Sequence, residues 1–533
     1  MSAPDSSKEE WKPKHNPWLI AVVVTMAAFM EVLDTTIVNV ALPHIAGSLG
    51  GSYDDSTWAL TAYLVANGIV LTISGWLSRL FGRKRYFLIC IVMFTVSSFL
   101  CGLAQSLPML VVFRLMQGFF GGGLQPSQQS IILDTFPPEK RGAAFGLTAI
   151  ATIVGPVLGP LLGGFLTDDY SWRWVFFVNI PFGIICVLAV SALVEDPPWE
   201  KRQRLPIDGL GIGLITLGLG CLELACDRGE DDDWFGSHFI ILMAVLGIVG
   251  IVGAIFWMLK ARQPLLRLEV FKDRNFATSM LLMSMVGALL YSSSVIIPQF
   301  AQQVQGYTAT TSGLLLAPGG ATVIVLIPIV GQLMKVIPLR YIIAFGFTLM
   351  GLSMFQAAHL NPKIDFATLI QYRVTQTAAL AFLFVPISTV AYSTLPRELN
   401  SDASALFSMC RNYLGSLAIS LSTAAVVEAR QRHQNDVAGH MITGRQPYTD
   451  YLNVVQKTAQ DHGLTPAAAH GFAMHKLMGE FTTQTAMLAY NEVFRWIGIL
   501  ALMVVPLCAL LAPSVKKRGG APAGGIEVDA GYS

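Results

Sequence analysis

Long runs of apolar residues alternate with short polar segments along almost the whole chain. Each run holds about 20 residues, the length that an α-helix needs to cross the hydrocarbon core of a bilayer. The pattern therefore predicts an all-α integral membrane protein with fourteen spans. The spans are expected at residues 18–43, 57–79, 86–104, 108–133, 143–167, 173–194, 207–225, 238–259, 277–302, 312–334, 341–360, 367–391, 403–427 and 491–513.

Charged residues gather between the predicted spans, and their signs alternate from one loop to the next. Basic loops at residues 79–85 and 260–274 contrast with the acidic run at residues 230–233. Because cytoplasmic loops carry an excess of Lys and Arg, both termini are predicted to lie in the cytoplasm. The polar segment 1–17 precedes the first apolar run without a convincing cleavage site, so the first span is expected to remain as an anchor.

The composition agrees with a membrane protein and indicates no cofactor. Of the 533 residues, 53% are hydrophobic and 13% are charged, whereas roughly one quarter of an average soluble protein is charged. All seven cysteines lie in apolar runs and none forms a CxxC pair, so no disulfide framework or metal knuckle is expected. No GxxxxGK[ST] motif is present, so no nucleotide is implied. We expect neither an enzyme nor a nucleic-acid partner.

An internal repeat divides the chain into two related parts. The motif LxxxRxxQ at residues 110–117 recurs 259 residues later at 369–376, and TFPPE at 135–139 recurs as TLPRE at 394–398 with the same offset. Both copies lie on the predicted cytoplasmic side, so the repeat is parallel. The predicted parts are a tail at 1–17, a six-helix bundle at 18–195, a linker with two extra helices at 196–276, a six-helix bundle at 277–513 and a disordered tail at 514–533.

One connection between predicted spans, residues 428–490, is far longer than the others and is expected on the periplasmic side. Thr465 followed by Pro466 is typical of a helix start, which predicts a helix over residues 467–489. Five of the nine histidines fall in this connection. Two of them on the expected helix are five residues apart and do not share a face, so we interpret them as solvated side chains rather than metal ligands.

Two acidic residues and one arginine lie inside predicted spans. Glu31 and Asp34 are three residues apart and share a helix face, and Arg114 lies in the fourth span. A charge at the bilayer centre costs at least about 2.5–3.5 kcal/mol, so each is a functional candidate. A purely structural pairing, or a position near a wet helix end, remains the alternative.

Arginine does not deprotonate in proteins, so Arg114 needs a permanent partner, and Asp34 is the nearest candidate. Arg373 raises the same question in the second part of the chain. Arg411 follows a cytoplasmic loop, where the simpler interpretation is a side chain that snorkels to the surface. The supporting polar candidates in these spans are Asn39, Gln117, Arg373 and Gln376.

Four segments combine glycine, proline and charged residues in recognisable motifs. They are LDTTIVNVALP at 33–43, GWLSRLFGRKR at 75–85, LVVFRLMQG at 110–118 and GPVLGPLLGG at 155–164. Together they resemble the signature motifs of the major facilitator superfamily. The two extra helices and the first motif are similar to its fourteen-helix drug:proton antiporter branch, and the long connection resembles that of EmrB-type multidrug exporters.

The resemblance implies a cytoplasmic gating loop built from Gly75, Gly82, Arg83, Lys84 and Asp134. Glycines permit a tight turn between two helices, and the basic residues can bind helix-end carbonyls or lipid headgroups. Charges that only set the topology are the alternative. The family usually has an aspartate where this chain has Arg79, which puts the charge relay of the motif in doubt.

The resemblance also implies an antiporter-motif helix at the interface between the two bundles. Gly155, Gly159 and Gly163 recur every four residues and form a ridge on which another helix can pack closely. Close packing alone is an equally good explanation of these glycines. The prolines remove backbone donors and are expected to bend the helix. The residues assigned to the motif are Gly155, Pro156, Gly159, Pro160, Gly163 and Gly164.

The function expected from these observations is proton-driven export of hydrophobic, cationic or neutral toxic compounds across a bacterial inner membrane, with Asp34, Glu31 and Arg114 as coupling residues and the proton gradient as the energy source. The resemblance further implies an EmrA-like periplasmic adaptor and a TolC-like outer-membrane channel as partners. A dedicated metabolite or siderophore exporter would share every motif. A membrane scaffold or receptor without transport would not need charges in apolar helices.

Overall fold

The computed structural model describes residues 13–197, 208–230, 232–261, 264–362, 364–441 and 445–511, and every regular element in them is a helix. The first half consists of α1 (Pro17–Leu49), α2 (Tyr53–Phe81), α3 (Arg83–Gly102), α4 (Leu107–Gly121), α5 (Leu124–Thr135), α6 (Pro138–Asp169), α7 (Trp174–Phe177) and α8 (Asn179–Leu193). An inserted pair follows, α9 (Gly209–Arg228) and α10 (His238–Lys260), with η1 (Trp234–Gly236) between them. The second half consists of η2 (Leu268–Lys272), α11 (Arg274–Gln303), α12 (Ala309–Val336), α13 (Leu339–Ala357), α14 (Phe366–Ala391), η3 (Arg397–Leu399), α15 (Asn400–Ala438), α16 (Gln446–Asp461), α17 (Pro466–Val504) and η4 (Val505–Leu510).

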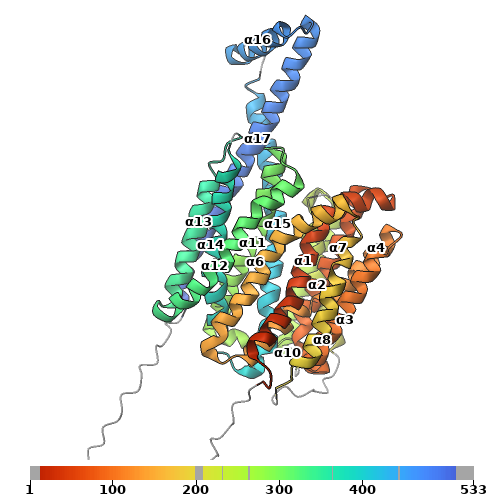
Figure 1. The fold of residues 1–533 in the computed structure, drawn as a ribbon, viewed down its shortest axis with the longest axis vertical. Helices are drawn as coiled ribbons and strands as arrows, with labels where there is room; N and C mark the ends of the chain where they lie inside the picture. Colours follow the sequence, from red (N-terminus) through yellow and green to blue (C-terminus); the bar gives the residue numbers. More distant parts are fainter. Residues whose placement is uncertain are drawn as a thin grey trace, which may run out of the picture.

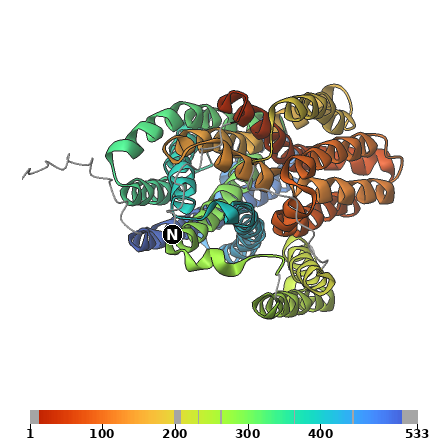
Figure 2. The same ribbon diagram turned by 90° about the horizontal axis from the view of Figure 1, so that it is seen from below.

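The two halves stand side by side, and the inserted pair lies at the edge of the molecule (Figures 1 and 2). Within the described residues, thirteen helical segments are long and apolar enough to cross a membrane. The fourteenth predicted span, 403–427, lies in α15, which contains buried polar and charged residues. Because α15 packs against α2, α5, α9, α11 and α17, these residues face protein instead of lipid.

Two predicted spans are each divided by a turn. The span predicted at 108–133 is divided into α4 and α5 by a turn at Gly122 and Gly123. A Cβ atom on Gly122 would lie 2.4 Å from the backbone oxygen of Asn67, so glycine is needed where this turn meets α2. The span predicted at 173–194 is likewise divided into α7 and α8. Hydropathy did not reveal either break, because the apolar run continues through both.

The predicted connection at 428–490 is largely helical. α15 continues to Ala438, and α17 begins at Pro466 and enters the last span without a break, so the predicted helix at 467–489 is its first part. The Thr465 hydroxyl accepts a hydrogen bond from the backbone N–H of Ala468 at 3.4 Å, as expected of an N-cap. We call α16 and the adjoining ends of α15 and α17 the extension, since they project beyond the rest of the molecule (Figure 1). Most of the predicted tail at 1–17 and the whole tail at 514–533 lie outside the described residues.

Helix α6 is in contact with α1 in its own half and with α12 and α14 in the other half, so it lies at the interface where the resemblance placed it. It runs as one helix through both of its internal prolines. A Cβ atom on Gly159 would lie 2.1 Å from the hydroxyl oxygen of Thr36, and one on Gly163 would lie 2.8 Å from the backbone oxygen of Ile37. The glycine ridge therefore lets the backbones of α1 and α6 approach each other closely.

We expect Gly159→Ala to destabilise the protein by about 1–3 kcal/mol, the usual effect of inserting an atom into a packed core. The added methyl group must displace Thr36 or separate α1 from α6. The measurement is the thermal unfolding of the purified protein in detergent.

Gly331→Ala on α12 is the matched control, since its Cβ atom would have no neighbour within 4 Å. Both changes give the same gain in helix propensity. An equal unfolding temperature for the two variants would contradict the close packing of α1 on α6.

Candidate functional site

Asp34 is the centre of a buried polar network in the first half. Its side chain on α1 is 0% exposed, and one carboxylate oxygen lies 2.5 Å from Nη1 of Arg114 on α4. The other oxygen accepts hydrogen bonds from Gln117 and Asn179, both at 2.8 Å. A carboxylate in an apolar bundle is tolerated when it is paired and its remaining lone pairs are satisfied, and this network meets both conditions.

Further contacts fix the orientation of Arg114. Its Nε donates to the backbone oxygen of Ala59 at 3.2 Å, and its Nη1 donates to Gln117 at 2.9 Å. The guanidinium carbon lies 4.0 Å from the centre of the Tyr63 ring, which adds a cation–π contact from α2. The structure thus brings Asp34, Arg114 and Gln117 together, three residues that the sequence selected separately.

The repeat reproduces half of this network in the second half. Arg373 Nη1 donates to Gln376 at 2.8 Å, as Arg114 does to Gln117. Instead of an acid, the other contact of Arg373 is the hydroxyl of Ser294 at 3.4 Å. In the described part of the chain no carboxylate forms an ion pair with Arg373. The two halves therefore share the arginine but not its counterion.

Glu31 is the second buried acid of α1 and belongs to a different network. It accepts a hydrogen bond from Asn67 at 3.0 Å and another from Gln125 on α5. Gln125 in turn accepts from Arg411 on α15, so this chain of contacts crosses between the halves. Arg411 is 0% exposed, and the expectation that it snorkels to the surface is wrong. Its approach from the second half gave no local signal in the sequence.

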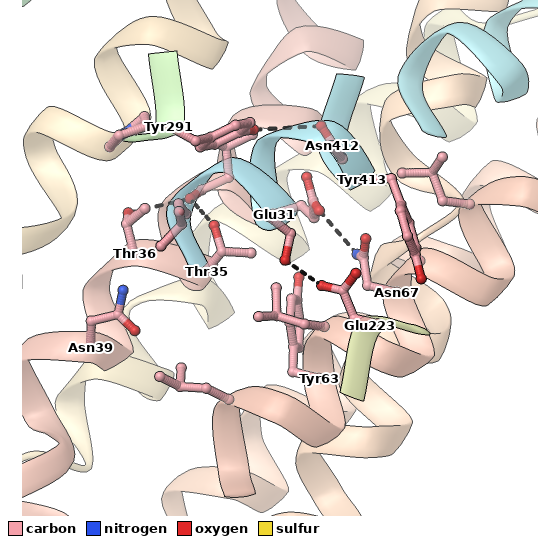
Figure 3. Close-up of a pocket in the computed structure, with 18 of the residues that line it drawn as sticks. Glu31, Thr35, Thr36, Asn39, Tyr63, Asn67, Glu223, Tyr291, Asn412 and Tyr413 are labelled. Atoms are coloured by element: carbon pink, nitrogen blue, oxygen red, sulfur yellow. Dashed lines mark hydrogen bonds between the residues drawn. The ribbon is translucent and has the colours of Figure 1, made fainter. Parts of the chain in front are cut away.

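A cavity of about 210 Å³ lies between the halves. Figure 3 shows Glu31, Asn67, Glu223 and Tyr413 converging on it from different helices. Arg114 also borders the cavity, whereas Asp34 lies behind it in the first half. Its other lining residues include Thr35, Thr36, Asn39, Tyr63, Pro156, Pro160, Tyr291, Asn412 and Ser416.

Glu223 was not identified from the sequence. It lies near the end of a predicted span on the inserted pair, which the repeat placed outside both bundles. In the structure α9 is in contact with both α2 and α15, and Glu223 is only 5% exposed. Its carboxylate accepts a hydrogen bond from the hydroxyl of Ser416 at 2.6 Å. An acid within an apolar run was the available signal.

The remaining antiporter-motif residues divide between packing and the cavity. Pro156 and Pro160 line the cavity, while the glycines face α1 as described above. Gly164 is buried, and its backbone oxygen accepts a hydrogen bond from Thr167 at 3.1 Å. One helix therefore connects the wall of the cavity to the close contact between α1 and α6.

The gating-loop residues form a second polar cluster at the far ends of α2 and α5. Arg83 forms an ion pair with Asp134, and both side chains are about 2% exposed. Asn400 at the start of α15 donates to the same carboxylate at 3.0 Å. Lys84 donates to the backbone oxygen of Ser191 at 2.7 Å. The turn itself passes through Gly82 with φ of +87°, a conformation that favours glycine.

Arg79 forms an ion pair across the two halves. Its guanidinium contacts the carboxylate of Asp402 on α15, which is 0% exposed, and Arg267 approaches the same carboxylate at 3.8 Å. Gly75 allows this approach, because a Cβ atom there would lie 3.1 Å from the Cα of Asp402. The chain that lacks the usual aspartate on α2 thus has an acid on the facing helix.

Comparison with known proteins agrees with this architecture. The profile of the Major Facilitator Superfamily matches residues 24–419. The chain is 35% identical to the multidrug export protein EmrB of Haemophilus influenzae, over 91% of this chain and 94% of that protein. It is 33% identical to the multidrug export protein EmrB of Escherichia coli K12, over 96% of this chain and 99% of that protein.

The fold also matches a solved structure of the superfamily. The proton:xylose symporter XylE aligns with a TM-score of 0.56 and 15% identity, over 93% of this chain and 99% of that one. At this identity the likeness concerns the fold alone. Taken with the family match and the identity to both EmrB proteins, it shows that the chain is a multi-pass membrane protein that belongs to the major facilitator superfamily, in its EmrB-type branch of multidrug exporters.

Proposed function

We propose that this protein exports hydrophobic small molecules across a bacterial inner membrane in exchange for protons, and that Asp34 carries the proton. The single observation that supports this role is the fully buried Asp34–Arg114 ion pair. A helix bundle without a transport function would not need such a costly pair of charges. The two EmrB relatives are named for multidrug export, which supports a broad range of substrates. The membrane potential supplies about 2.3 kcal/mol per charge per 100 mV.

The proposed coupling follows from the partners of Asp34. Protonation removes the charge that holds Arg114, and it weakens the hydrogen bonds from Gln117 and Asn179. Because Asp34 on α1 is the acceptor for α4 and α8, its neutralisation loosens α1 against both helices. Arg114 and the Tyr63 ring beneath it border the cavity, so a change in their position reaches the bound substrate directly.

One ion pair and one hydrogen bond, at the ends of α2 and α5, are proposed to close the cytoplasmic side. Arg79 with Asp402 joins the halves directly, and Asp134 with Asn400 joins them beside it. The carboxylates leave these partners when the halves separate at this end. In the closed arrangement each of these carboxylates has its partner in place, so loss of one partner would leave a buried charge exposed to the full cost of its burial.

The extension is proposed to bind a periplasmic adaptor of the EmrA type, which would lead to a TolC-like channel. Cytoplasmic termini would put the extension on the periplasmic side. It exposes apolar side chains, with Val454 at 65%, Phe472 at 50% and Met478 at 58%. Such side chains beyond the bundle are available to a partner protein.

We expect Asp34→Asn to abolish proton-coupled export while the protein still folds and binds substrate, because the amide keeps the shape but cannot titrate. The measurements are substrate-induced proton release in detergent and gradient-driven export in proteoliposomes. Asp168→Asn is the matched control, since Asp168 is 59% exposed near the end of α6. Export by the Asp34 variant with an unchanged dependence on the proton gradient would show that Asp34 is structural.

The ion pair between Arg79 and Asp402 can be tested with a double-mutant cycle. Arg79→Met or Asp402→Asn alone is expected to cost about 3–5 kcal/mol, because each leaves a buried charge with fewer partners. The double variant should cost less than the sum, with a coupling of at least about 1 kcal/mol. Thermal unfolding measures stability and drug export measures function. Strictly additive effects on both would contradict the proposed closure.

The exposed apolar side chains of the extension can be tested as a docking site with point substitutions that leave the fold of the extension intact. Phe472→Ser together with Met478→Ser should end co-purification with the adaptor and lower drug resistance in a two-membrane host, while purified protein still binds drug. The control is His470→Ser with His475→Ser, on exposed positions of the same helix. Retention of both the adaptor and resistance by the apolar variant would exclude this surface as the docking site.

A further inference from the structure

The inserted pair contributes a buried acid to the cavity between the halves. Glu223 lies on α9, lines the cavity beside Asn67 and Tyr413, and is 5% exposed. Figure 3 places it on the opposite side of the cavity from Tyr291 and Asn412. The two extra helices therefore do more than surround a complete twelve-helix transporter, since one of them forms part of the wall of its cavity.

Two contacts hold this part of α9 against the second half. The Tyr413 hydroxyl donates to the backbone oxygen of Leu219 at 2.5 Å, and the Ser416 hydroxyl donates to Glu223 at 2.6 Å. Both donors are on α15. The turn of α9 from Leu219 to Glu223 is thus held against α15 at both of its ends. The hydroxyl of Ser416 holds the carboxylate of Glu223 at the cavity.

Glu223 lacks a cationic partner in the described part of the chain. No lysine, arginine or histidine forms an ion pair with it there, and its hydrogen bond comes from a neutral hydroxyl. The cation nearest to the cavity, Arg114, is already paired with Asp34, and Arg411 donates to Gln125. A buried carboxylate without a cation is costly, so a positively charged ligand would supply what the protein does not.

The other lining groups suit an organic cation. Glu31 adds a second carboxylate, held by amides instead of a cation. Tyr63, Tyr291 and Tyr413 border the same space, and aromatic rings attract a cation positioned over their faces. The hydroxyl oxygen of Tyr63 is fully buried and has no hydrogen-bond partner among the described residues. Carboxylates and aromatic rings together are the lining expected for a lipophilic cation.

We propose that Glu223 is a specificity-determining residue that makes this cavity select lipophilic organic cations, such as quaternary phosphonium and ammonium compounds, over uncharged molecules of the same size. This inference rests on the proposed export function and names its substrate class. Glu223 binds the positive charge, the tyrosines contact the apolar groups around it, and the Asp34–Arg114 pair serves the proton.

The test compares two probes of similar bulk on the full-length purified protein. Tetraphenylphosphonium carries a positive charge, and triphenylphosphine oxide is neutral. Glu223→Gln should weaken the binding of tetraphenylphosphonium about tenfold or more, and should change the binding of triphenylphosphine oxide less than about twofold. Glu223→Asp should restore part of the affinity for the cation. Equilibrium dialysis measures both affinities, and proteoliposome export of each probe provides a second readout.

Glu492→Gln is the matched control, because Glu492 pairs with Arg432 and His433 away from the cavity lining. The control should bind both probes as the wild type does. Equal loss of both probes in Glu223→Gln would show a structural role and overturn the inference, as would unchanged binding of the cation. Wild-type protein that exports only the neutral probe would overturn the inference and leave the export function standing. Wild-type protein that neither binds nor exports either probe would overturn both.

Discussion

The cost of a charge inside an apolar helix bundle governs the arrangement of this protein. An unpaired ion in such surroundings costs several kcal/mol, so a partner with defined geometry strongly favours a buried charge. Asp34 has one arginine and two amides, and Arg79 has an aspartate from the other half. Each partner lies on another helix than the charge that it contacts. The charges consequently act as specific connections between the helices.

The two halves share the LxxxRxxQ repeat but differ in the charges around it. Arg114 and Arg373 occupy corresponding places in the repeat, and each donates to the glutamine three residues later. Only the first half has an acid at this place. In the second half the hydroxyl of Ser294 contacts Arg373, where a counterpart of Asp34 would be expected. A serine binds an arginine but cannot exchange a proton in the accessible pH range. The repeat thus gives two arginine–glutamine pairs, of which one also has the carboxylate on which the proposed proton exchange depends.

Local patterns in the sequence predicted what depends on local physics. Apolar run length gave the spans, and the spacing of three residues put Glu31 and Asp34 on one helix face. The ion pair of Arg79 with Asp402 was beyond such patterns, because its residues are 323 positions apart and meet only when the halves pack. The same holds for Arg411, whose partner Gln125 lies 286 positions away. The turn at Gly122 was hidden because the apolar run continues through it, and the need for glycine there comes from the neighbouring backbone of α2.

The inserted pair shows how the cavity can be linked to motion between the halves. On its side facing α2, α9 has charged groups in its contacts: Asp227 accepts from Thr61, and Arg228 donates to Thr57 at 2.8 Å. On its side facing α15, the contacts are the two hydroxyl hydrogen bonds from Tyr413 and Ser416.

Hydrogen bonds to charged groups are in general the stronger ones, but Glu223 is itself an acid, so the Ser416 contact is strong only while Glu223 is ionised. Under the proposed function, a proton or a bound cation at Glu223 would weaken that contact, and α9 would then stay with the first half when the halves separate. A substrate in the cavity would in this way weaken a contact that holds the two halves together. The contact is made by α9, a helix that belongs to neither half of the repeat.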